Sequence, residues 1–363
     1  MRIEELKKIK NFFYVETLYS LFICLLLEND LDKNFYFFSS KFNESVRNNL
    51  KNKIVIRELR SIRIIDYIAN AIFYRVIKLF FYYKSKNKNF YIHDAGKYAQ
   101  YFFNNFKSKF ILVEDGTLNY NSYTISKEKE KLKRKINFSK KLKRRFVYGI
   151  EKIYPVLGVS EKIEKIFLTG ILPIPDIIKP KVEIINIEDR WEKMSEEKKR
   201  QILSIFNIAL DDLKKLENID SKILLLTQPL SEDGIISEEE KINIYREILK
   251  ERDIKEIFIK EHPREKTNYI NEFRDIKVNI IKKDFPVEIL LLLNIKFDKV
   301  ITIFSTAALN FKEKSEIEFI GTKKYPKLLD RFGVLEDNKE QGTRNKEQNN
   351  ITYLSQLIKL KIA

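Results

Sequence analysis

Residues 258–264 read Phe-Ile-Lys-Glu-His-Pro-Arg and contain His262, one of only two histidines among the 363 residues. An apolar run ends at this point, and a proline follows the histidine directly. A strand that stops on His-Pro-Arg brings an imidazole and a guanidinium to the rim of a sheet, where α/β proteins bind anionic ligands. The segment therefore predicts an α/β fold and, at the end of one strand, an anion site.

Short apolar runs alternate with longer amphipathic segments on both sides of this strand. The short runs predict strands at residues 12–16, 35–38, 53–57, 90–93, 110–114, 182–187, 222–227, 255–260, 277–281, 298–303 and 316–320. The longer segments predict helices at residues 18–28, 63–83, 96–106, 192–205, 238–251, 286–293 and 306–312. Such alternation is typical of parallel sheets with helices on both faces. We therefore expect an α/β protein with two Rossmann-like domains and a cleft between them.

The length of the chain also favours two domains, because 363 residues exceed one ordinary hydrophobic core. Three prolines interrupt regular structure within residues 171–181. We expect an N-terminal domain over residues 1–178 and a C-terminal domain over residues 179–363. The last amphipathic stretch, residues 351–362, predicts a C-terminal tail that packs back on the body.

The single cysteine and the N-terminal apolar stretch bear on the cellular compartment. Cys24 excludes an intramolecular disulfide and a cysteine-based zinc site, and fits a reducing compartment. Residues 11–27 are apolar, but Glu16 and Thr17 interrupt them, and the remainder is too short to span a bilayer. No signal-cleavage pattern follows. The expected location is the cytoplasm.

The net charge of +17 is concentrated in one block. Residues 127–145 contain 11 Lys or Arg against 2 Glu, and apolar residues recur there at roughly helical spacing. A basic amphipathic helix on an anionic membrane surface fits this pattern, and a plain solvated helix fits it equally well. Nucleic acid is a third and weaker alternative, because no base-reading motif is present. The protein is thus expected to be cytoplasmic or peripheral on the inner face of the membrane.

Two predicted loops place acids after strands. The first contains Glu114, Asp115 and Gly116, where an ordinary strand-to-turn junction is the simpler interpretation. The second runs from Thr227, Gln228 and Pro229 to Asp233 and a glycine. Ser237 and Glu240 form a capping-box pattern for the next helix, so some of these acidic residues are explained by helix capping. Asp233 lies outside that pattern and is a candidate for chemistry.

Two further loops predict anion binding. Lys260, Pro263 and Arg264 surround His262, and this grouping favours a phosphate over a solvated surface histidine. Ser305 and Thr306 follow a strand and begin a helix, where free backbone N–H groups and the helix dipole attract phosphate. A simple N-cap role for Ser305 is compatible with this. The second histidine, His93, also ends a strand; we assign it a structural or acceptor-side role and not a catalytic one.

Together, the order and spacing of these loops carry more information than any one of them. The loops lie within five short motifs, VEDGTLNYNSY, LLLTQPLSEDG, KEHPR, FPVE and IFSTAALNFK, which are spread over roughly residues 110–312. Glu288 of FPVE lies 26 residues after His262, and Ser305 lies 43 residues after it. With these motifs the chain resembles the bacterial sialyltransferases, and most closely glycosyltransferase family 52, the lipooligosaccharide sialyltransferases.

The resemblance implies a fold of the GT-B type and an inverting, metal-independent sialyltransferase. The C-terminal domain would bind the donor CMP-N-acetylneuraminate, and the N-terminal domain would contribute contacts to a terminal galactose of a surface glycolipid or glycan. No metal and no cofactor besides the donor are implied, and the sequence contains no Asp-x-Asp motif. Dimers occur among family members, so a homodimer is a further expectation. The linkage formed is not predicted.

The resemblance also suggests a role for each residue. His262 would support the leaving CMP phosphate together with Lys260, Arg264, Ser305 and Thr306. Glu288 would accept hydrogen bonds from the cytidine, and Phe285 and Pro286 would line the nucleoside pocket. Asp115 and Asp233 are both candidates for the general base. Asp233 is slightly favoured, because it shares a rigid domain with His262.

Two alternative functions stay open on the sequence alone. A GT-B transferase that uses another nucleotide sugar, such as a UDP-linked donor, would use the same phosphate-binding residues. A basic nucleic-acid-binding protein is suggested by the net charge only, and it predicts strongly salt-dependent oligonucleotide binding.

Overall fold

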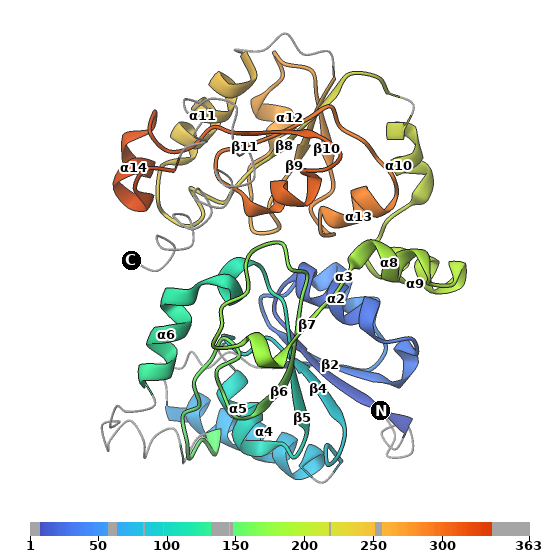
Figure 1. The fold of residues 1–363 in the computed structure, drawn as a ribbon, viewed down its shortest axis with the longest axis vertical. Helices are drawn as coiled ribbons and strands as arrows, with labels where there is room; N and C mark the ends of the chain where they lie inside the picture. The colour runs from blue at the N-terminus through green and yellow to red at the C-terminus, as the bar shows by residue number, and fades with distance from the viewer. Residues whose placement is uncertain are drawn as a thin grey trace. The chain divides into compact units, whose positions relative to one another are not determined.

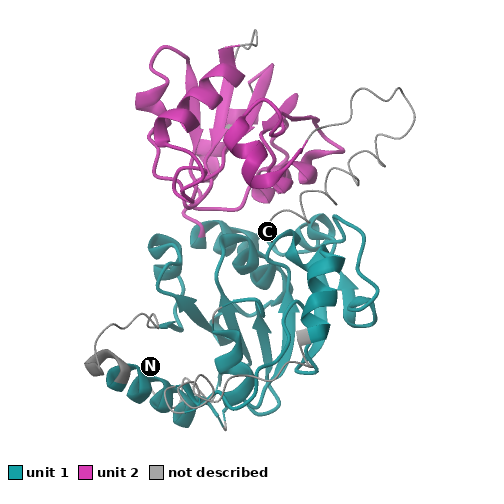
Figure 2. Cartoon of the chain, turned by 90° about the vertical axis from the view of Figure 1, so that its left-hand side faces the viewer, with its two compact units in different colours: residues 1–205 teal, residues 206–363 magenta. Residues whose placement is uncertain are grey.

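The computed structural model describes residues 8–56, 64–82, 84–96, 98–131, 145, 148–217, 219–250 and 256–335. The chain divides into two compact units, residues 1–205 (unit 1) and 206–363 (unit 2), shown in teal and magenta in Figure 2. Each unit contains one parallel sheet with its helices (Figure 1). The predicted tail helix and most of the basic block at 127–145 fall outside the described residues.

Unit 1 is built on a seven-stranded sheet in the order β3-β2-β1-β4-β5-β6-β7. Every neighbouring pair in this sheet is parallel. The strands are β1 (Asn11–Val15), β2 (Asn34–Ser39), β3 (Lys53–Ile56), β4 (Asn89–Ile92), β5 (Lys109–Val113), β6 (Ile163–Leu168) and β7 (Val182–Ile184). The order reverses between β1 and β4, which is the position where open α/β sheets bind ligands.

Several helices surround this sheet. They are α2 (Leu18–Leu27), α3 (Glu44–Asn48), α4 (Ile64–Phe81), α5 (Ala99–Asn105), α6 (Ser122–Lys131), α8 (Ile187–Glu192) and α9 (Glu196–Ile205). Short 3-10 turns add η1 (Leu31–Lys33), η2 (Thr117–Tyr120) and η3 (Lys179–Lys181). The helix predicted at 192–205 corresponds to α9, whereas α8 ends at Glu192 and was not predicted.

Aromatic residues form the core of unit 1 because the parallel register aligns them in rows. Phe12 is level with Phe35 on β2 and with Phe90 on β4, whereas the next residue, Phe13, is level with two tyrosines. Successive side chains of a strand point to opposite faces, so the two rows cover opposite sides of the sheet. Phe81 of α4 packs edge-on against Phe12, with ring centroids 5.7 Å apart. The C-terminal end of α4 therefore covers part of this face, and Phe102 of α5 covers another part.

Strand β6 was not predicted from the sequence. Its residues Glu164 and Lys165 are both exposed and break the alternation expected of a strand. A register shift against β5 accounts for this, since Phe110 is level with Ile163 but Ile111 is level with Lys165. A bulge of this kind inserts one residue and turns two consecutive side chains to the same side.

The division between the units lies at residues 205 and 206, later than the boundary expected at 178 and 179. The run predicted as the first strand of the second domain, 182–187, contains β7, which pairs with β6. Helix α8 then packs on α2 of the same unit. The prolines at 173, 175 and 180 thus mark a loop within unit 1 and do not separate the two units.

Unit 2 repeats the same pattern with five parallel strands in the order β10-β9-β8-β11-β12. The strands are β8 (Lys222–Leu226), β9 (Glu256–Lys260), β10 (Val278–Ile281), β11 (Lys299–Thr302) and β12 (Glu316–Phe319). The helices are α10 (Leu210–Glu217), α11 (Glu238–Lys250), α12 (Tyr269–Glu272), α13 (Glu288–Leu292) and α14 (Pro326–Phe332). The helix predicted at 306–312 is instead the 3-10 helix η4 (Thr306–Phe311). The two predicted parallel α/β sheets are confirmed.

The aromatic core of unit 1 gives a test of the fold. Phe37 on β2 is fully buried and its ring contacts Phe81, Phe90 and Phe102. Phe37→Ala is expected to lower the free energy of unfolding by about 3–5 kcal/mol, because it leaves a cavity that the sheet cannot close. Denaturant titration measures this, with Tyr123→Ala on the exposed side of α6 as the control. Equal losses in both variants would contradict the described core.

Candidate functional site

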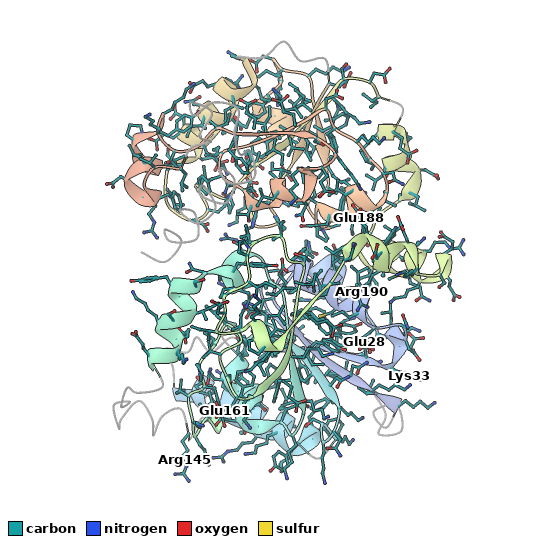
Figure 3. The ribbon with its side chains drawn as sticks, viewed as in Figure 1. Glu28, Lys33, Arg145, Glu161, Glu188 and Arg190 are labelled. Atoms are coloured by element: carbon teal, nitrogen blue, oxygen red, sulfur yellow. The ribbon has the colours of Figure 1, made fainter. Side chains whose placement is uncertain are left out.

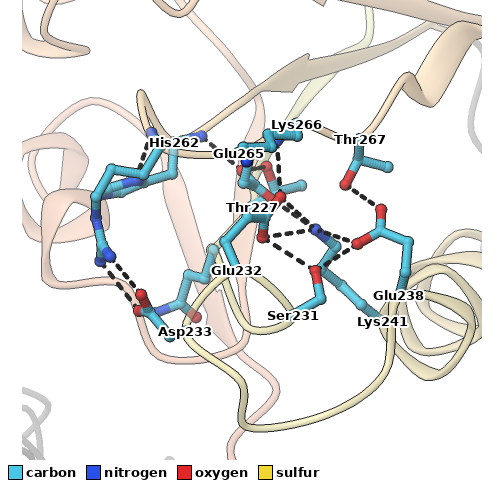
Figure 4. Close-up of polar contacts among 12 residues, drawn as sticks. Thr227, Ser231, Glu232, Asp233, Glu238, Lys241, His262, Glu265, Lys266 and Thr267 are labelled. Atoms are coloured by element: carbon cyan, nitrogen blue, oxygen red, sulfur yellow. Dashed lines mark hydrogen bonds and ion pairs between the residues drawn. The ribbon is translucent and has the colours of Figure 1, made fainter. Parts of the chain in front are cut away.

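The carboxyl ends of β8 and β9 in unit 2 are tied together by one buried ammonium group. The Lys241 side chain of α11 is fully buried, and its Nζ lies 2.9 Å from Glu232, 3.1 Å from Glu238 and 3.8 Å from Glu265 (Figure 4). Glu232 belongs to the loop after β8, and Glu265 belongs to the loop after β9. The burial of one cation among several carboxylates therefore fixes both loops to the same helix.

Glu265 arranges the backbone of the His262 loop. Its Oε2 accepts the His262 N–H at 2.7 Å and the Thr227 hydroxyl at 2.6 Å, while its Oε1 accepts the Tyr269 hydroxyl at 2.7 Å. Burial raises the pKa of the Glu265 carboxyl, and these hydrogen bonds oppose the shift. The carboxylate acts as a hub that links β8, the His262 loop and α12.

The β8 loop residues predicted to bind substrate are buried and bonded within unit 2. Pro229 is buried, and the Gln228 N–H donates to the Tyr245 hydroxyl at 2.7 Å. The Gln228 side-chain oxygen accepts the Phe304 N–H at 3.2 Å. This last bond joins the ends of β8 and β11, the two strands between which the strand order reverses. Thr227 and Gln228 thus hold the ends of the strands in place through hydrogen bonds.

His262 is half-buried, and its ring orientation is set locally. The Arg264 N–H donates to His262 Nδ1 at 3.2 Å. In the neutral imidazole this places the ring proton on Nε2, the nitrogen that can donate to an anion. Pro263 and Arg264 are exposed, so the turn presents its side chains at the surface of unit 2.

Asp233 is paired with the Arg264 guanidinium. One guanidinium nitrogen lies 3.0 Å from Asp233 Oδ2, and a second contacts Oδ1. Gly234, with φ of 70°, makes the turn that follows. The predicted capping box is confirmed in the same loop: the Glu240 N–H donates to Ser237 Oγ at 3.1 Å, and Glu240 Oε2 accepts the Ser237 N–H at 2.8 Å.

Lys260 ends β9 and lies almost fully buried. Its Nζ donates to the Lys282 carbonyl at 2.6 Å and stands 4.4 Å from the centre of the Phe285 ring. Burial lowers the pKa of Lys260 to about 7, against the attraction of Asp284, Glu261 and Glu288. Phe285 and Pro286 are buried beside it. An anion that reached this ammonium would favour its charged form.

The remaining predicted donor residues lie near the end of β11 and the start of α13. Glu288 is buried as the first residue of α13 and accepts the Asn310 side-chain amide at 2.8 Å. Ser305 occupies the N-cap position of η4, but its side chain makes no capping hydrogen bond. Its N–H donates to Thr302 Oγ1 at 3.1 Å. The expected α-helix is thus a 3-10 helix of six residues, and the Ser305 and Thr306 hydroxyl groups at its start remain the predicted phosphate-binding groups.

Unit 1 gathers a second polar group at the ends of β1, β4 and β5. Asp115 accepts a hydrogen bond from the Thr17 hydroxyl, and its Oδ2 lies 3.4 Å from His93 Nε2. Both the Asp115 and His93 side chains are 8% exposed. No partner for His93 Nδ1 is found among the residues that the structure describes. Gly116 follows with φ of 95°, and a Cβ there would meet no atom within 4 Å.

Glu114, which precedes Asp115, is engaged within unit 1. Its carboxylate accepts from the Thr169 hydroxyl at 2.9 Å and from the Tyr120 hydroxyl at 2.7 Å. Burial raises the pKa of Glu114, and the hydrogen bonds oppose the shift. The residue joins the ends of β5 and β6 and so holds the backbone of Asp115 in place.

Comparison with known proteins places the chain in a family. The sequence matches the profile of glycosyltransferase family 52 over residues 20–324. The chain belongs to glycosyltransferase family 52. It is also 41% identical over 232 residues to an uncharacterized protein of Haemophilus influenzae, covering 63% of this chain and 68% of that protein. The sequence-based assignment to family 52 is confirmed, and the protein is a glycosyltransferase.

Solved structures of bacterial sialyltransferases have the same fold. The α/β-galactoside α-2,3-sialyltransferase of Photobacterium phosphoreum aligns with a TM-score of 0.57 at 13% identity, covering 96% of this chain and 95% of that one. A 2,6-sialyltransferase of Photobacterium sp. JT-ISH-224, solved with CMP and lactose, aligns with a TM-score of 0.58 at 12% identity, covering 98% of this chain and 77% of that one. The GT-B domain of the Photobacterium damselae sialyltransferase gives 0.51 at 14% identity, over 97% of this chain and 96% of that one. The expected GT-B type fold is confirmed.

Several residues that organise this family 52 protein were missed by sequence reasoning. Lys241, Glu265 and Tyr245 look like ordinary helix or loop residues in the sequence, and their burial comes from tertiary packing. The pairing of His93 with Asp115 could have been anticipated, since both residues follow strands that prove to be neighbours. Within the described residues, no group of three or more His, Cys, Asp or Glu could hold a metal ion.

The buried ammonium gives a test of how the loops after β8 and β9 are held. Lys241→Met is expected to lower the free energy of unfolding by roughly 3–5 kcal/mol, because it leaves Glu232 and Glu265 buried without their cation. Lys327→Met, which removes the ammonium from an exposed pair with Glu240, is the matched control and should have little effect. Chemical denaturation of both variants measures the difference. A Lys241→Met protein as stable as wild type would contradict the hub role.

Proposed function

We propose that the protein is an inverting, metal-independent sialyltransferase that moves N-acetylneuraminic acid from CMP-N-acetylneuraminate to a terminal galactose. Membership of family 52 supports a nucleotide-sugar donor. The proposal rests on the positions of three residues at the end of β9: Lys260 ends the strand, and His262 and Arg264 lie on the loop that follows, at the edge where parallel sheets bind ligands. Structural neighbours that act on galactosides, one of them solved with CMP and lactose, support the choice of donor and acceptor.

In the proposed reaction the bond between the sialyl anomeric carbon and the CMP phosphate oxygen breaks, and a bond to the acceptor hydroxyl forms. His262 donates from Nε2 to the leaving phosphate, and Arg264 and Lys260 offset its charge. Binding of the phosphate would favour the charged form of Lys260, whose pKa of about 7 leaves it half-protonated at neutral pH. Ser305 and Thr306 add hydroxyl donors, and Glu288, Phe285 and Pro286 hold the cytidine.

For the general base we favour Asp115 over Asp233. A base must take a proton from the acceptor hydroxyl, and Asp233 is engaged by the positive charge of Arg264. Asp115 is oriented by the Thr17 hydroxyl and by His93 Nε2, 3.4 Å away, and not by a guanidinium. The buried Nδ1 of His93, without a partner among the described residues, supports the acceptor-side role expected for this histidine.

The donor assignment is tested by nucleotide protection. CMP is expected to raise the melting temperature appreciably, while UDP and GDP at equal concentration change it little, because only the cognate nucleotide binds the folded state tightly. His262→Ala should weaken turnover strongly and retain the fold. A shift with UDP alone would indicate a transferase with a UDP-linked donor. Salt-sensitive protection by oligonucleotides alone would indicate the nucleic-acid alternative.

The two aspartates are tested by comparing Asp115→Asn with Asp233→Asn. Removing the base is expected to reduce kcat by about 100-fold or more, whereas loss of an Arg264 partner should act mainly on donor KM. Transfer to lactose, measured over a range of donor concentrations, separates the two effects. If Asp115→Asn keeps near wild-type kcat, Asp115 is not the base.

We further propose that the enzyme works on lipid-linked acceptors at an anionic membrane surface, with residues 127–145 in contact with lipid. None of the described helices combines the length and the apolar character needed to cross a bilayer. The basic block supports peripheral contact, because anionic lipids attract clustered Lys and Arg. A cytoplasmic location and a homodimer stay predictions.

A further inference from the structure

The carboxyl end of β1 carries a carboxylate that the proposed proton transfer does not use. Glu16 directly follows β1, which ends at Val15, and is half-buried. The strand order of unit 1 reverses between β1 and β4, so Glu16 lies at the position where open α/β sheets bind ligands. The next residue, Thr17, donates its hydroxyl to Asp115. Glu16 is therefore the neighbour in sequence of the residue that orients the proposed base.

A buried tyrosine orients the Glu16 carboxylate. Side chains two residues apart on an extended chain point to the same side, and the Tyr14 hydroxyl donates to Glu16 Oε1. Burial of Tyr14 and the charge of Glu16 raise the pKa of this hydroxyl well above its ordinary value, so it stays protonated and remains a donor. The bond uses one carboxylate oxygen. No partner for Glu16 Oε2 is found among the residues that the structure describes.

Gly96, on the loop after β4, leaves the space that this pair occupies. A Cβ at residue 96 would lie 2.9 Å from Tyr14 Cε1 and 3.0 Å from Glu16 Cδ. Atoms in van der Waals contact lie about 3.5–4.0 Å apart, so a larger residue would displace the tyrosine ring or the carboxylate. The loops after β1 and β4 thus fit together at the strand-order reversal because residue 96 has no side chain.

The loop after β4 also offers a second polar atom at this edge. His93 is buried, and its backbone N–H donates to the Tyr14 carbonyl at 3.4 Å. Its Nε2 lies 3.4 Å from Asp115, whereas Nδ1 has no partner in the described part of the chain. Buried polar atoms are nearly always paired in folded proteins. The free nitrogen therefore marks a place that a ligand hydroxyl or a water molecule fills.

The charges at this edge favour a neutral ligand rich in hydroxyl groups. Glu16 and Asp115 both carry carboxylates, which accept hydrogen bonds when ionised and repel anions. A sugar hydroxyl can donate to such a group, and hydrogen bonds to charged groups are stronger than those between neutral groups. This chemistry suits a sugar acceptor and does not suit the phosphate of a nucleotide.

We propose that Glu16 binds hydroxyl groups of the acceptor sugar that do not react, and so helps to set acceptor specificity and to turn the reacting hydroxyl toward Asp115. The inference rests on the proposed sialyl transfer, in which unit 1 contacts a galactose acceptor. Glu16 takes up no proton in this role. Tyr14 holds one of its oxygens, and the other accepts from the sugar.

The test compares Glu16→Gln with Glu28→Gln in the full chain. The first substitution removes the charge and keeps an oxygen that can accept from Tyr14. Glu28, labelled in Figure 3, is the matched control: it is also half-buried and accepts a tyrosine hydroxyl, from Tyr91, but it bonds Asn11 at 2.8 Å, at the opposite end of β1. Glu16→Gln is expected to raise the KM for lactose about 10- to 100-fold and to leave the KM for the donor within about twofold. Glu28→Gln should change neither constant.

Equilibrium binding of lactose in the presence of CMP needs no turnover, and it separates failure of this inference from failure of sialyl transfer. If the wild type forms no sialyllactose, but lactose binding falls in Glu16→Gln and not in Glu28→Gln, the proposed reaction fails and the role of Glu16 stands. Absence of lactose binding by the wild type would overturn both proposals.

Three results would overturn the role of Glu16 alone. One is a lactose KM in Glu16→Gln within about twofold of wild type. Another is a lower kcat with unchanged KM, which would place Glu16 in the chemical step. The third is an equal rise in lactose KM in Glu28→Gln, which would show a general effect on the fold. Gly96→Ala, which crowds the carboxylate without removing it, should raise the lactose KM and leave protection by CMP unchanged.

Discussion

The buried ammonium of Lys241 is the interaction on which the loops after β8 and β9 depend. Two carboxylates, Glu232 and Glu265, approach it from loops that follow different strands. A charge buried so deeply is tolerated only when it is paired. Removing one partner leaves the other charges buried without compensation and destabilises the fold. Glu265 also accepts the His262 N–H. The position of the His262 backbone therefore depends on the pairing of Glu265 with Lys241.

Both units place polar residues at the point where the strand order of their sheet reverses, but the residue types differ. In each, the strand order reverses beside the first strand of the sheet, and the polar residues follow the strands at this point. Unit 2 places cations there, in Lys260 and Arg264, as suits the phosphate of the proposed donor. Unit 1 places Asp115 beside His93, as suits proton transfer from the proposed acceptor hydroxyl.

The sequence predicted most strands and the loops that carry chemistry, because each apolar run is short and ends in a proline, glycine or polar cluster. It missed β6, where a bulge exposes Glu164 and Lys165 side by side. It also placed residues 182–187 in the wrong sheet, since the pairing of β7 with β6 is a long-range contact that leaves no local pattern. The pairing of Asp233 with Arg264 was equally hidden, as it joins loops 31 residues apart.

The central claim is that this family 52 protein transfers a sialic acid from a CMP-linked donor. The most direct measurement is mass and NMR analysis of the product formed from CMP-N-acetylneuraminate and lactose. We expect sialyllactose with the anomeric configuration inverted relative to the donor, together with free CMP. Absence of sialyllactose, with sugar transfer to lactose from a UDP-linked donor under the same conditions, would contradict it.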